Sequence, residues 1–360
     1  MNADAARALI RQAIVRRVFP AAVVQVGASA DVVFDEAFGR VTFDDESAEA
    51  TADTEFDLAS LTKPIAATAI ALQLMESAGL RLDDPVAAFF PEWRGRDRER
   101  VVVQDLLEHA SGLPARLVDA APGGRREFEH EICATALEYT PGSKSIYSDL
   151  GFVLLGFLLE DRGGAPLAPQ FDAIRATVGS VETRLADIRA PLEFKPPASN
   201  RARIAPTIPM DDDARRGRTL RGEVHDSYAA ALGGIAGHAG LFGTGASVGA
   251  FARAVLRAAR GDAAIPSPLS PALVRLATTK SRVPESSRAL GWDTMLASSS
   301  CGTRMSPSAF GHVGYTGTSV WIDPERDRYF VLLTNRACGG GTLDEMREVR
   351  RAFHDAMADT

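Results

Sequence analysis

The 360-residue chain is poor in cysteine, in positive charge and in long apolar segments, and each shortage excludes a class of protein. Its cysteines, Cys133, Cys301 and Cys338, are too few and too widely spaced for a disulfide framework or a zinc site, so a reducing compartment is expected. Forty basic and 47 acidic residues give a net charge of −7, which argues against nucleic-acid binding and against attraction to membranes. Apolar runs such as residues 150–159 are far shorter than the roughly 20 residues that span a bilayer.

What is present is an ordinary globular composition, with 46% hydrophobic and 24% charged residues. Charges are spread through the first 20 residues without an unbroken apolar stretch before a cleavage site, so no signal peptide and a cytoplasmic location are expected. No histidine cluster with metal-ligand spacing occurs, and no metal or other cofactor is expected. The sequence indicates no oligomeric state.

Strand-like patterns occur near both ends of the chain, whereas the middle is helical. Strands are expected at residues 21–26, 32–38, 290–292, 311–322 and 329–335, and helices at 4–19, 60–77, 247–259 and 343–357. This order predicts an α/β fold of the α+β type, with an antiparallel sheet built from N- and C-terminal strands, flanked by helices, and a mainly helical insertion. Residues 1–81 and 231–360 would form the α/β domain and residues 82–230 the helical region, with the active site at their junction.

The sharpest local pattern is Ser60-Leu-Thr-Lys63 at the start of an apolar helix. Residues three apart share a helix face, so the serine hydroxyl and the lysine amine are expected within hydrogen-bond reach. An adjacent base is what turns serine into a nucleophile. The simpler alternative is a helix-capping serine followed by a solvated lysine. Only four of the 40 basic residues are lysine, however, and Lys63 is followed by apolar residues, which favours the catalytic interpretation.

Two further patterns carry candidate site residues. Tyr147-Ser-Asp149 precedes an apolar helix, where a phenol can relay a proton between nucleophile and leaving group, although helix capping explains the same residues. In residues 311–318, glycines interrupt a strand, which is typical of a strand that a ligand approaches closely. The backbone N–H of Tyr315 would then be available to an oxyanion. The alternative is a bulged strand with a packed His312.

The three patterns occur in the order of the penicillin-recognising serine hydrolases, namely S-x-x-K, Y-x-N and K-T-G. The string LLEHASGLP at residues 106–114 is similar to the LLxHxSGLP of that superfamily, and residues 222–226, 232–242 and 290–294 add to the likeness. From about Phe19 to Arg336 the chain resembles the β-lactamase-related serine hydrolases. That family includes class C β-lactamases, D-amino-acid peptidases and esterases, and the resemblance implies a β-lactamase/transpeptidase-like fold.

The resemblance also implies roles for individual residues. Ser60 would be the acylated nucleophile, and Lys63 and Tyr147 would share the general-base and general-acid roles. The backbone N–H groups of Ser60 and Tyr315 would form the oxyanion hole. Acyl transfer to Ser60 would be followed by hydrolysis of the acyl-enzyme.

Two departures from the family pattern bear on the substrate. Asp149 replaces the usual asparagine and can hold Lys63 charged, which moves proton transfer toward Tyr147. His312, before Val313 and Gly314, replaces the lysine of K-T-G by a group that titrates near neutrality, so recognition of a substrate carboxylate should be weak and pH dependent. We therefore expect an esterase acting on small carboxylic esters, with β-lactamase or D-amino-acid peptidase activity on an amide as the alternative.

Two competing interpretations stay open at this point. Residues 245–249 form a G-x-S-x-G pattern, which would make Ser247 the nucleophile with Asp293 and His312 as its partners. The chain lacks the alternating strands and helices that this fold requires, and a helix cap at Ser247 is simpler. The second interpretation is a catalytically inactive descendant that uses its cleft as a binding module.

Overall fold

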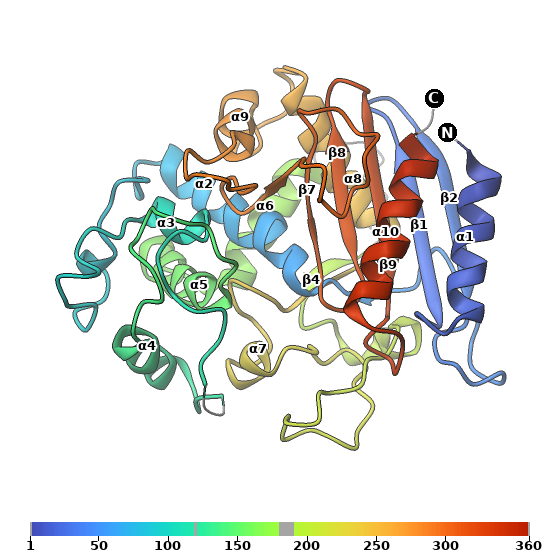
Figure 1. The fold of residues 1–360 in the computed structure, drawn as a ribbon, viewed down its shortest axis with the longest axis horizontal. Coiled ribbons are helices and arrows are strands. Elements are labelled where there is room, and N and C mark those ends of the chain that lie inside the picture. Colours follow the sequence, from blue (N-terminus) through green and yellow to red (C-terminus); the bar gives the residue numbers. More distant parts are fainter. Residues whose placement is uncertain (1, 119–120, 180–190, 359–360) are drawn as a thin grey trace.

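A six-stranded antiparallel sheet, in the order β2-β1-β9-β8-β7-β6, forms one side of the computed structural model, which describes residues 2–118, 121–179 and 191–358 (Figure 1). Its strands are β1 (Ala21–Gly27), β2 (Val32–Gly39), β6 (Asp293–Thr294), β7 (Phe310–Val313), β8 (Ser319–Asp323) and β9 (Arg328–Thr334). Strands from both parts of the sequence meet in its middle, where Ala22 of β1 pairs with Thr334 of β9. The expected antiparallel sheet built from N- and C-terminal strands is confirmed.

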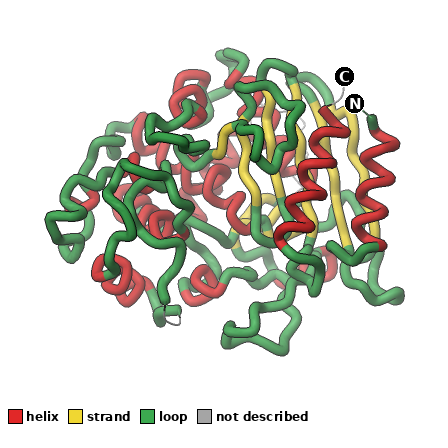
Figure 2. The backbone as a smooth tube through the Cα atoms, in the orientation of Figure 1, coloured by secondary structure: helices red, strands yellow, loops and turns green. Residues whose placement is uncertain are grey.

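Helices cover both faces of this sheet (Figures 1 and 2). Successive side chains of a strand point to opposite faces, and β1 is buried on both. Ala22, Val24 and Val26 pack with α1 (Ala3–Val15) and α10 (Leu343–Ala358), whereas Ala21 and Val23 belong to the core that contains α8 (Gly245–Ala259). The sheet is therefore a central layer between two helical layers.

The helical part of the chain packs beside the sheet and is centred on α5 (Asp149–Gly163), in which every residue from Leu150 to Leu159 is buried. The other helices are α2 (Ala69–Glu76), α3 (Val103–Leu107), α4 (Arg125–Ala134), α6 (Leu167–Gly179), α7 (Ser227–Ala231) and α9 (Pro271–Thr278), with short turns η3 (Val86–Ala88) and η4 (Ala198–Arg203). None of the helices in the described ranges has both the length and the apolar character needed to cross a membrane.

A small second sheet, β3-β5-β4, links the two parts of the chain. Its strands are β3 (Phe56–Asp57), β5 (Leu241–Gly243) and β4 (Leu192–Phe194). The sequence patterns did not predict β3 and β4, because strands of two or three residues are defined by their partner and not by local alternation. Since β4 lies within residues 82–230 and pairs with a strand outside them, the expected domain division stays a prediction.

Two elements near the site differ from the sequence-based expectation. The helix expected over residues 60–77 is a 3₁₀ turn, η1 (Ala59–Leu61), then a π-helical segment, η2 (Lys63–Thr68), and then α2. The strand expected over residues 311–322 is the hairpin of β7 and β8, in which Gly314 N donates to Thr318 O at 2.8 Å to close the turn. Both differences lie at the cavity that contains Ser60 and Tyr315.

Candidate active site

Ser60 lies in η1, directly after β3. The backbone turns sharply before it, because Ala59 adopts a φ of 49° and donates its N–H to Asp57 Oδ1 at 2.8 Å. Lys63 begins η2, and its Nζ lies 3.1 Å from Ser60 Oγ. The S-x-x-K spacing therefore brings the hydroxyl and the amine together, as the argument from the helix face predicts.

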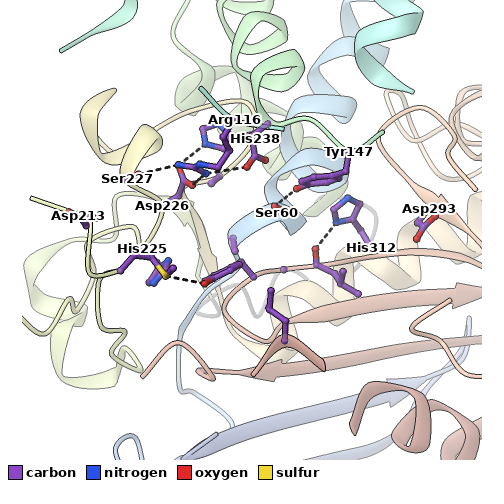
Figure 3. A pocket seen from close by; sticks show the side chains of 18 of the residues that line it. Ser60, Arg116, Tyr147, Asp213, His225, Asp226, Ser227, His238, Asp293 and His312 are labelled. Atoms are coloured by element: carbon purple, nitrogen blue, oxygen red, sulfur yellow. Dashed lines mark hydrogen bonds and ion pairs between the residues drawn. The ribbon is translucent and has the colours of Figure 1, made fainter. Parts of the chain in front are cut away.

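Tyr147 completes a triangle of polar atoms with Ser60 and Lys63. Its hydroxyl lies 2.6 Å from Ser60 Oγ (Figure 3). The same hydroxyl accepts a hydrogen bond from Lys63 Nζ at 2.6 Å. Lys63 is fully buried, and its Nζ also donates to the carbonyl of His238 at 3.1 Å. The ring of His109 packs on Tyr147, with centroids 4.7 Å apart, and holds the phenol in place. This contact between hydroxyl, phenol and amine is what a proton relay at a serine requires.

Asp149 forms a buried ion pair with Lys63, with 2.8 Å between Nζ and Oδ1. Burial by itself lowers the pKa of Lys63, but the contacts with the Asp149 carboxylate and with Tyr147 together outweigh burial and raise this pKa. Burial by itself raises the pKa of Asp149, yet the Lys63 charge lowers it. Burial and the Asp149 charge raise the pKa of Tyr147. At neutral pH the site therefore holds an ammonium, a carboxylate and a neutral phenol.

Arg116 and Asp226 extend this charge network along the pocket wall (Figure 3). Arg116 bridges the two carboxylates, at 3.2 Å from Asp149 and 2.8 Å from Asp226. His238 Nε2 lies 2.7 Å from Asp226 Oδ1, and Arg116 also donates to Ser227 Oγ at 3.1 Å. Sequence reasoning missed Arg116, and Asp226 was visible only as the last residue of the family-like string 222–226. Each charge on this wall is paired with another one.

His312 lines the pocket but is not the titrating group that the sequence predicts. It is 2% exposed, and its Nδ1 lies 2.8 Å from the carbonyl oxygen of Val313. Burial, assisted by the charges of Lys63 and Arg288, lowers the pKa of His312 well below its ordinary value of 6.5, so the ring is neutral at physiological pH. The expected titration near neutrality is therefore wrong, because sequence alone did not reveal that this position is enclosed.

Arg288 is a pocket residue that sequence reasoning did not single out. Its guanidinium lies 5.4 Å from the ring centroid of Tyr147. Within the described ranges no carboxylate is at ion-pair distance from it. Arg288 is thus a pocket cation that is free to meet an anionic group of a ligand. Its sequence context offered no signal, because arginine is common in this chain.

The turn between β7 and β8, residues 314–318, is hydrogen-bonded to the backbone that precedes Ser60 in the sequence. Thr316 Oγ1 donates to the carbonyl of Asp57 at 2.7 Å, and Thr318 Oγ1 donates to that of Leu58 at 3.0 Å. A Cβ added to Gly314 would lie 2.6 Å from the Leu58 carbonyl oxygen, so this close approach requires glycine. The hairpin and the Ser60 segment are therefore held in a fixed relation.

Two backbone donors of this region have no partner among the residues that the structure describes. Neither the N–H of Ser60 nor that of Tyr315 donates a hydrogen bond to any other part of the chain that the structure describes. Both residues line a cavity of about 500 Å³ above the Ser60 hydroxyl. Two unpartnered N–H groups beside a nucleophile are the elements of an oxyanion hole.

One rim of the cavity is apolar and exposed. Met210, Tyr315 and Leu343 expose 50%, 38% and 50% of their surface there, and the Tyr315 hydroxyl lies 3.0 Å from Met210 Sδ. This rim contrasts with the paired charges of Arg116, Asp149 and Asp226 on the cavity wall. The cavity therefore offers an apolar surface to a ligand at its entrance.

Ser247 does not take part in this site. It lies in the first turn of α8, is 4% exposed and donates to the carbonyl of Pro191 at 2.8 Å, and its backbone N–H is bound by the cap residue Thr244. The G-x-S-x-G pattern is thus part of a helix start, with Thr244 as the cap where the sequence suggested Ser247. Of the residues that the structure describes, no group of three or more His, Cys, Asp or Glu is placed to hold a metal ion.

Known proteins resemble the chain over most of its length. Residues 6–354 match the family model described as Beta-lactamase. An Escherichia coli (strain K12) protein with the name "Putative D-alanyl-D-alanine carboxypeptidase" is 31% identical over 321 residues, 81% of this chain and 71% of that protein. EstCE1, "a hydrolase with promiscuous acyltransferase activity", has a TM-score of 0.74 at 20% identity, over 98% of both chains. The class C beta lactamase from Rhodobacter sphaeroides has a TM-score of 0.74 at 18% identity, also over 98% of both. These likenesses confirm the expected fold.

Proposed function

The chain belongs to the Beta-lactamase family and is a serine hydrolase, and from this premise we propose that it cleaves esters of small carboxylic acids through an acyl-enzyme on Ser60. Membership of a family of enzymes sets aside the alternative of an inactive binding module.

Acylation would follow a relay in which the charge of Lys63 does not change. Ser60 Oγ bonds to the acyl carbon, and the serine proton passes to the Tyr147 oxygen. Tyr147 gives its own proton to the departing alkoxide, so it is a neutral phenol before and after the step. The ammonium of Lys63, bonded to both oxygens, stabilises the negative charge that moves between them. Water then attacks the acyl carbon, and the same relay returns a proton to Ser60 and releases the acid.

The single observation that carries the proposal is the position of the two free N–H groups relative to the proton-transfer triangle. Ser60 and Tyr315 both line the cavity, their N–H groups have no hydrogen-bond partner among the described residues, and Tyr147 and Lys63 are bonded to the Ser60 hydroxyl. A carbonyl substrate on this serine would place its oxygen between the two N–H groups. Such donors stabilise the tetrahedral intermediate, which is the charged species of acyl transfer.

Two features favour esters without a carboxylate. The ring of His312 is neutral, so it supplies no fixed cation at the position of the K-T-G lysine. The exposed rim of Met210, Tyr315 and Leu343 suits an apolar acyl or alcohol group. A small ester with an apolar group would therefore bury that group at the rim while its carbonyl reaches Ser60.

Intact-protein mass spectrometry tests this proposal. Wild-type protein and Ser60→Ala are incubated with a p-nitrophenyl acyl ester, and turnover is followed by release of p-nitrophenol. We expect an added acyl mass and turnover in the wild type alone. Equal turnover by Ser60→Ala, or no adduct and no turnover in the wild type, would overturn the proposal.

A second candidate function, hydrolysis of a β-lactam or of a D-amino-acid amide with a free carboxylate, is favoured by Arg288. This unpaired pocket cation can bind a carboxylate through charge-assisted hydrogen bonds worth about 1.5–3 kcal/mol. Arg288→Met would then lower kcat/KM for a carboxylate substrate by about 10- to 100-fold and change that for a neutral ester less than about twofold. A prompt penicillin adduct on Ser60 that Arg288→Met abolishes would favour this function over the ester. An equal loss on both substrates would contradict the assignment of Arg288.

A further inference from the structure

Two buried arginines donate hydrogen bonds to the turn that carries Tyr315, and one of them, Arg350, also lines the cavity. Arg350, on α10, donates through Nη2 to the carbonyl oxygens of Gly314 at 2.7 Å and Thr318 at 2.8 Å. Arg336, which follows β9, donates to the carbonyl oxygen of Tyr315 through Nη2 at 2.7 Å and through Nε at 3.2 Å. Consecutive carbonyls of the turn therefore point at two guanidinium groups.

Among the described residues, neither arginine has an anionic partner. Arg350 is 5% and Arg336 7% exposed, and no carboxylate lies within ion-pair distance of either one in the described ranges. Arg350 Nε has no hydrogen-bond partner there either. Burial, assisted by the Arg336 charge, lowers the pKa of Arg350 to about 9, so the group still carries its charge at neutral pH. Buried charges are ordinarily paired, and two unpaired ones side by side call for an explanation.

The geometry of the peptide group supplies that explanation. The carbonyl of Gly314 and the N–H of Tyr315 belong to one planar peptide, and in a trans peptide they point in opposite directions. The bond from Arg350 to the carbonyl therefore fixes the plane of this peptide and with it the direction of the Tyr315 N–H, which points away from the guanidinium. A charged donor on the carbonyl also polarises the peptide, which makes the N–H on its other side a stronger donor.

We propose that Arg350 is a positioning residue for the oxyanion hole, which acts through the Gly314–Tyr315 peptide, and that Arg336 supports it at the next carbonyl. This inference rests on the proposed function, in which the Tyr315 N–H binds the oxyanion. An oxyanion formed beside Tyr315 supplies the negative charge that the two arginines lack. Because the substrate carbonyl is neutral, this electrostatic gain arises in the transition state and not on substrate binding.

The test compares Arg350→Gln with Arg350→Lys. Glutamine keeps an N–H donor for the Gly314 carbonyl but removes the charge, whereas lysine keeps the charge on a different donor. Arg347→Gln is the matched control, because Arg347 lies one turn earlier on α10 and also donates to a backbone carbonyl, that of Ser298 at 2.9 Å, but is exposed. The readouts are kcat and KM for a neutral p-nitrophenyl ester and the Ki of a boronic acid, which forms a tetrahedral anionic adduct with the serine.

For Arg350→Gln we expect kcat and boronate affinity to fall together by about 10- to 100-fold, while KM changes less than about threefold. This loss is at most comparable to that caused by removing one oxyanion donor outright. Arg350→Lys should recover at least a third of the wild-type kcat, and Arg347→Gln should match the wild type. A folded Arg350→Gln that keeps kcat and Ki within threefold, or that changes KM alone, would overturn the inference.

A merely structural role would lower the melting temperature without changing kcat per correctly folded molecule, so active molecules are counted by burst titration. If Arg350→Gln does not fold, Arg336→Gln is measured in its place with the same readouts, and its boronate affinity should fall more than its KM changes. Absence of any boronate adduct in the wild type would overturn the proposed function itself. A wild-type adduct with unaltered variants would overturn this inference alone.

Discussion

Replacement of Asp149 by asparagine distinguishes two routes for the serine proton. The pKa of Lys63 lies above its ordinary value of 10.5, because the contacts with Asp149 and Tyr147 together outweigh the effect of burial. At pH 7, which is at least 3.5 units lower, fewer than about one molecule in 3,000 would have a neutral Lys63. At 1.36 kcal/mol per unit, a mechanism that needs this neutral amine begins about 5 kcal/mol uphill. The relay through a neutral Tyr147 carries no such cost.

The two routes predict different pH profiles for wild type and Asp149→Asn. For the relay, kcat/KM of the wild type should change less than about threefold between pH 6 and 9. Asp149→Asn removes the charge that raises the pKa of Lys63, so its alkaline loss of activity should begin at a lower pH. The assay is p-nitrophenyl ester hydrolysis, with Ser60→Ala subtracted for hydroxide-catalysed hydrolysis. A wild-type rate that rises about tenfold per pH unit over this range, with a faster Asp149→Asn at pH 7, would refute the relay.

The fold of Asp149→Asn must be measured alongside its rate. Removal of one partner from a buried ion pair costs up to about 3–5 kcal/mol, and Arg116 loses a partner as well. Asp161→Asn is the matched control, because Asp161 also lies on α5 and pairs with Arg125 but is half exposed. Rates are therefore compared per folded molecule, from circular dichroism and burst titration.

Three further outcomes follow from the structure. Ser247→Ala should lower the free energy of unfolding, measured in urea, by about 0.5–2 kcal/mol, because the start of α8 loses hydrogen bonds. The same variant should leave kcat/KM within about twofold of the wild type. Lost turnover would restore the G-x-S-x-G interpretation. Gly314→Ala should slow acylation at least about 100-fold, because the added Cβ would meet the carbonyl of Leu58, two residues before Ser60 in the sequence. Mass spectrometry measures the acylation rate, and a normal rate would contradict this close approach. The folded pKa of Lys63 is raised, so its contribution to stability is present below pH 10.5, and that of Asp149 is lowered, so its contribution is present above pH 3.8. The stability lost in Asp149→Asn, measured by urea unfolding, should thus be constant from about pH 5 to 9 and shrink as pH falls below about 3.8; a loss that varies between pH 5 and 9 would contradict the ion pair.

Local patterns in the sequence were sufficient for the long elements and for the contact between Ser60 and Lys63. The hairpin of β1 and β2 follows from two apolar stretches around Gly27–Asp31, and α10 follows from its apolar spacing. The contact between Ser60 and Lys63 follows from their separation by three residues, although the segment is a 3₁₀ turn and a π-helical segment and not the single helix expected. Each of these features depends on residues that are neighbours along the chain.

The remaining features depend on residues that meet only in the folded molecule. Arg116 reaches Asp226 across 110 positions, and Arg350 reaches Gly314 across 36, so no local pattern indicates either contact. The pKa of His312 is set by its enclosure, which the residues adjoining it in sequence do not determine. Long-range charge placement is therefore what sequence reasoning could not supply for this site.

The pairing of β1 with β9 has a consequence for how the protein is made. Ala22 emerges from the ribosome long before its partner Thr334, and at about 5–20 residues per second the interval is about 15–60 s. During that time β1 has one unpaired edge, the kind of edge on which strands of other molecules add, and a chaperone that covers it would protect the nascent chain. Ser60 is also synthesised well before β7 and Tyr315. On the proposed mechanism, an unfinished chain therefore carries the serine without the Tyr315 N–H, and hydrolysis is expected only after the last strands join the sheet.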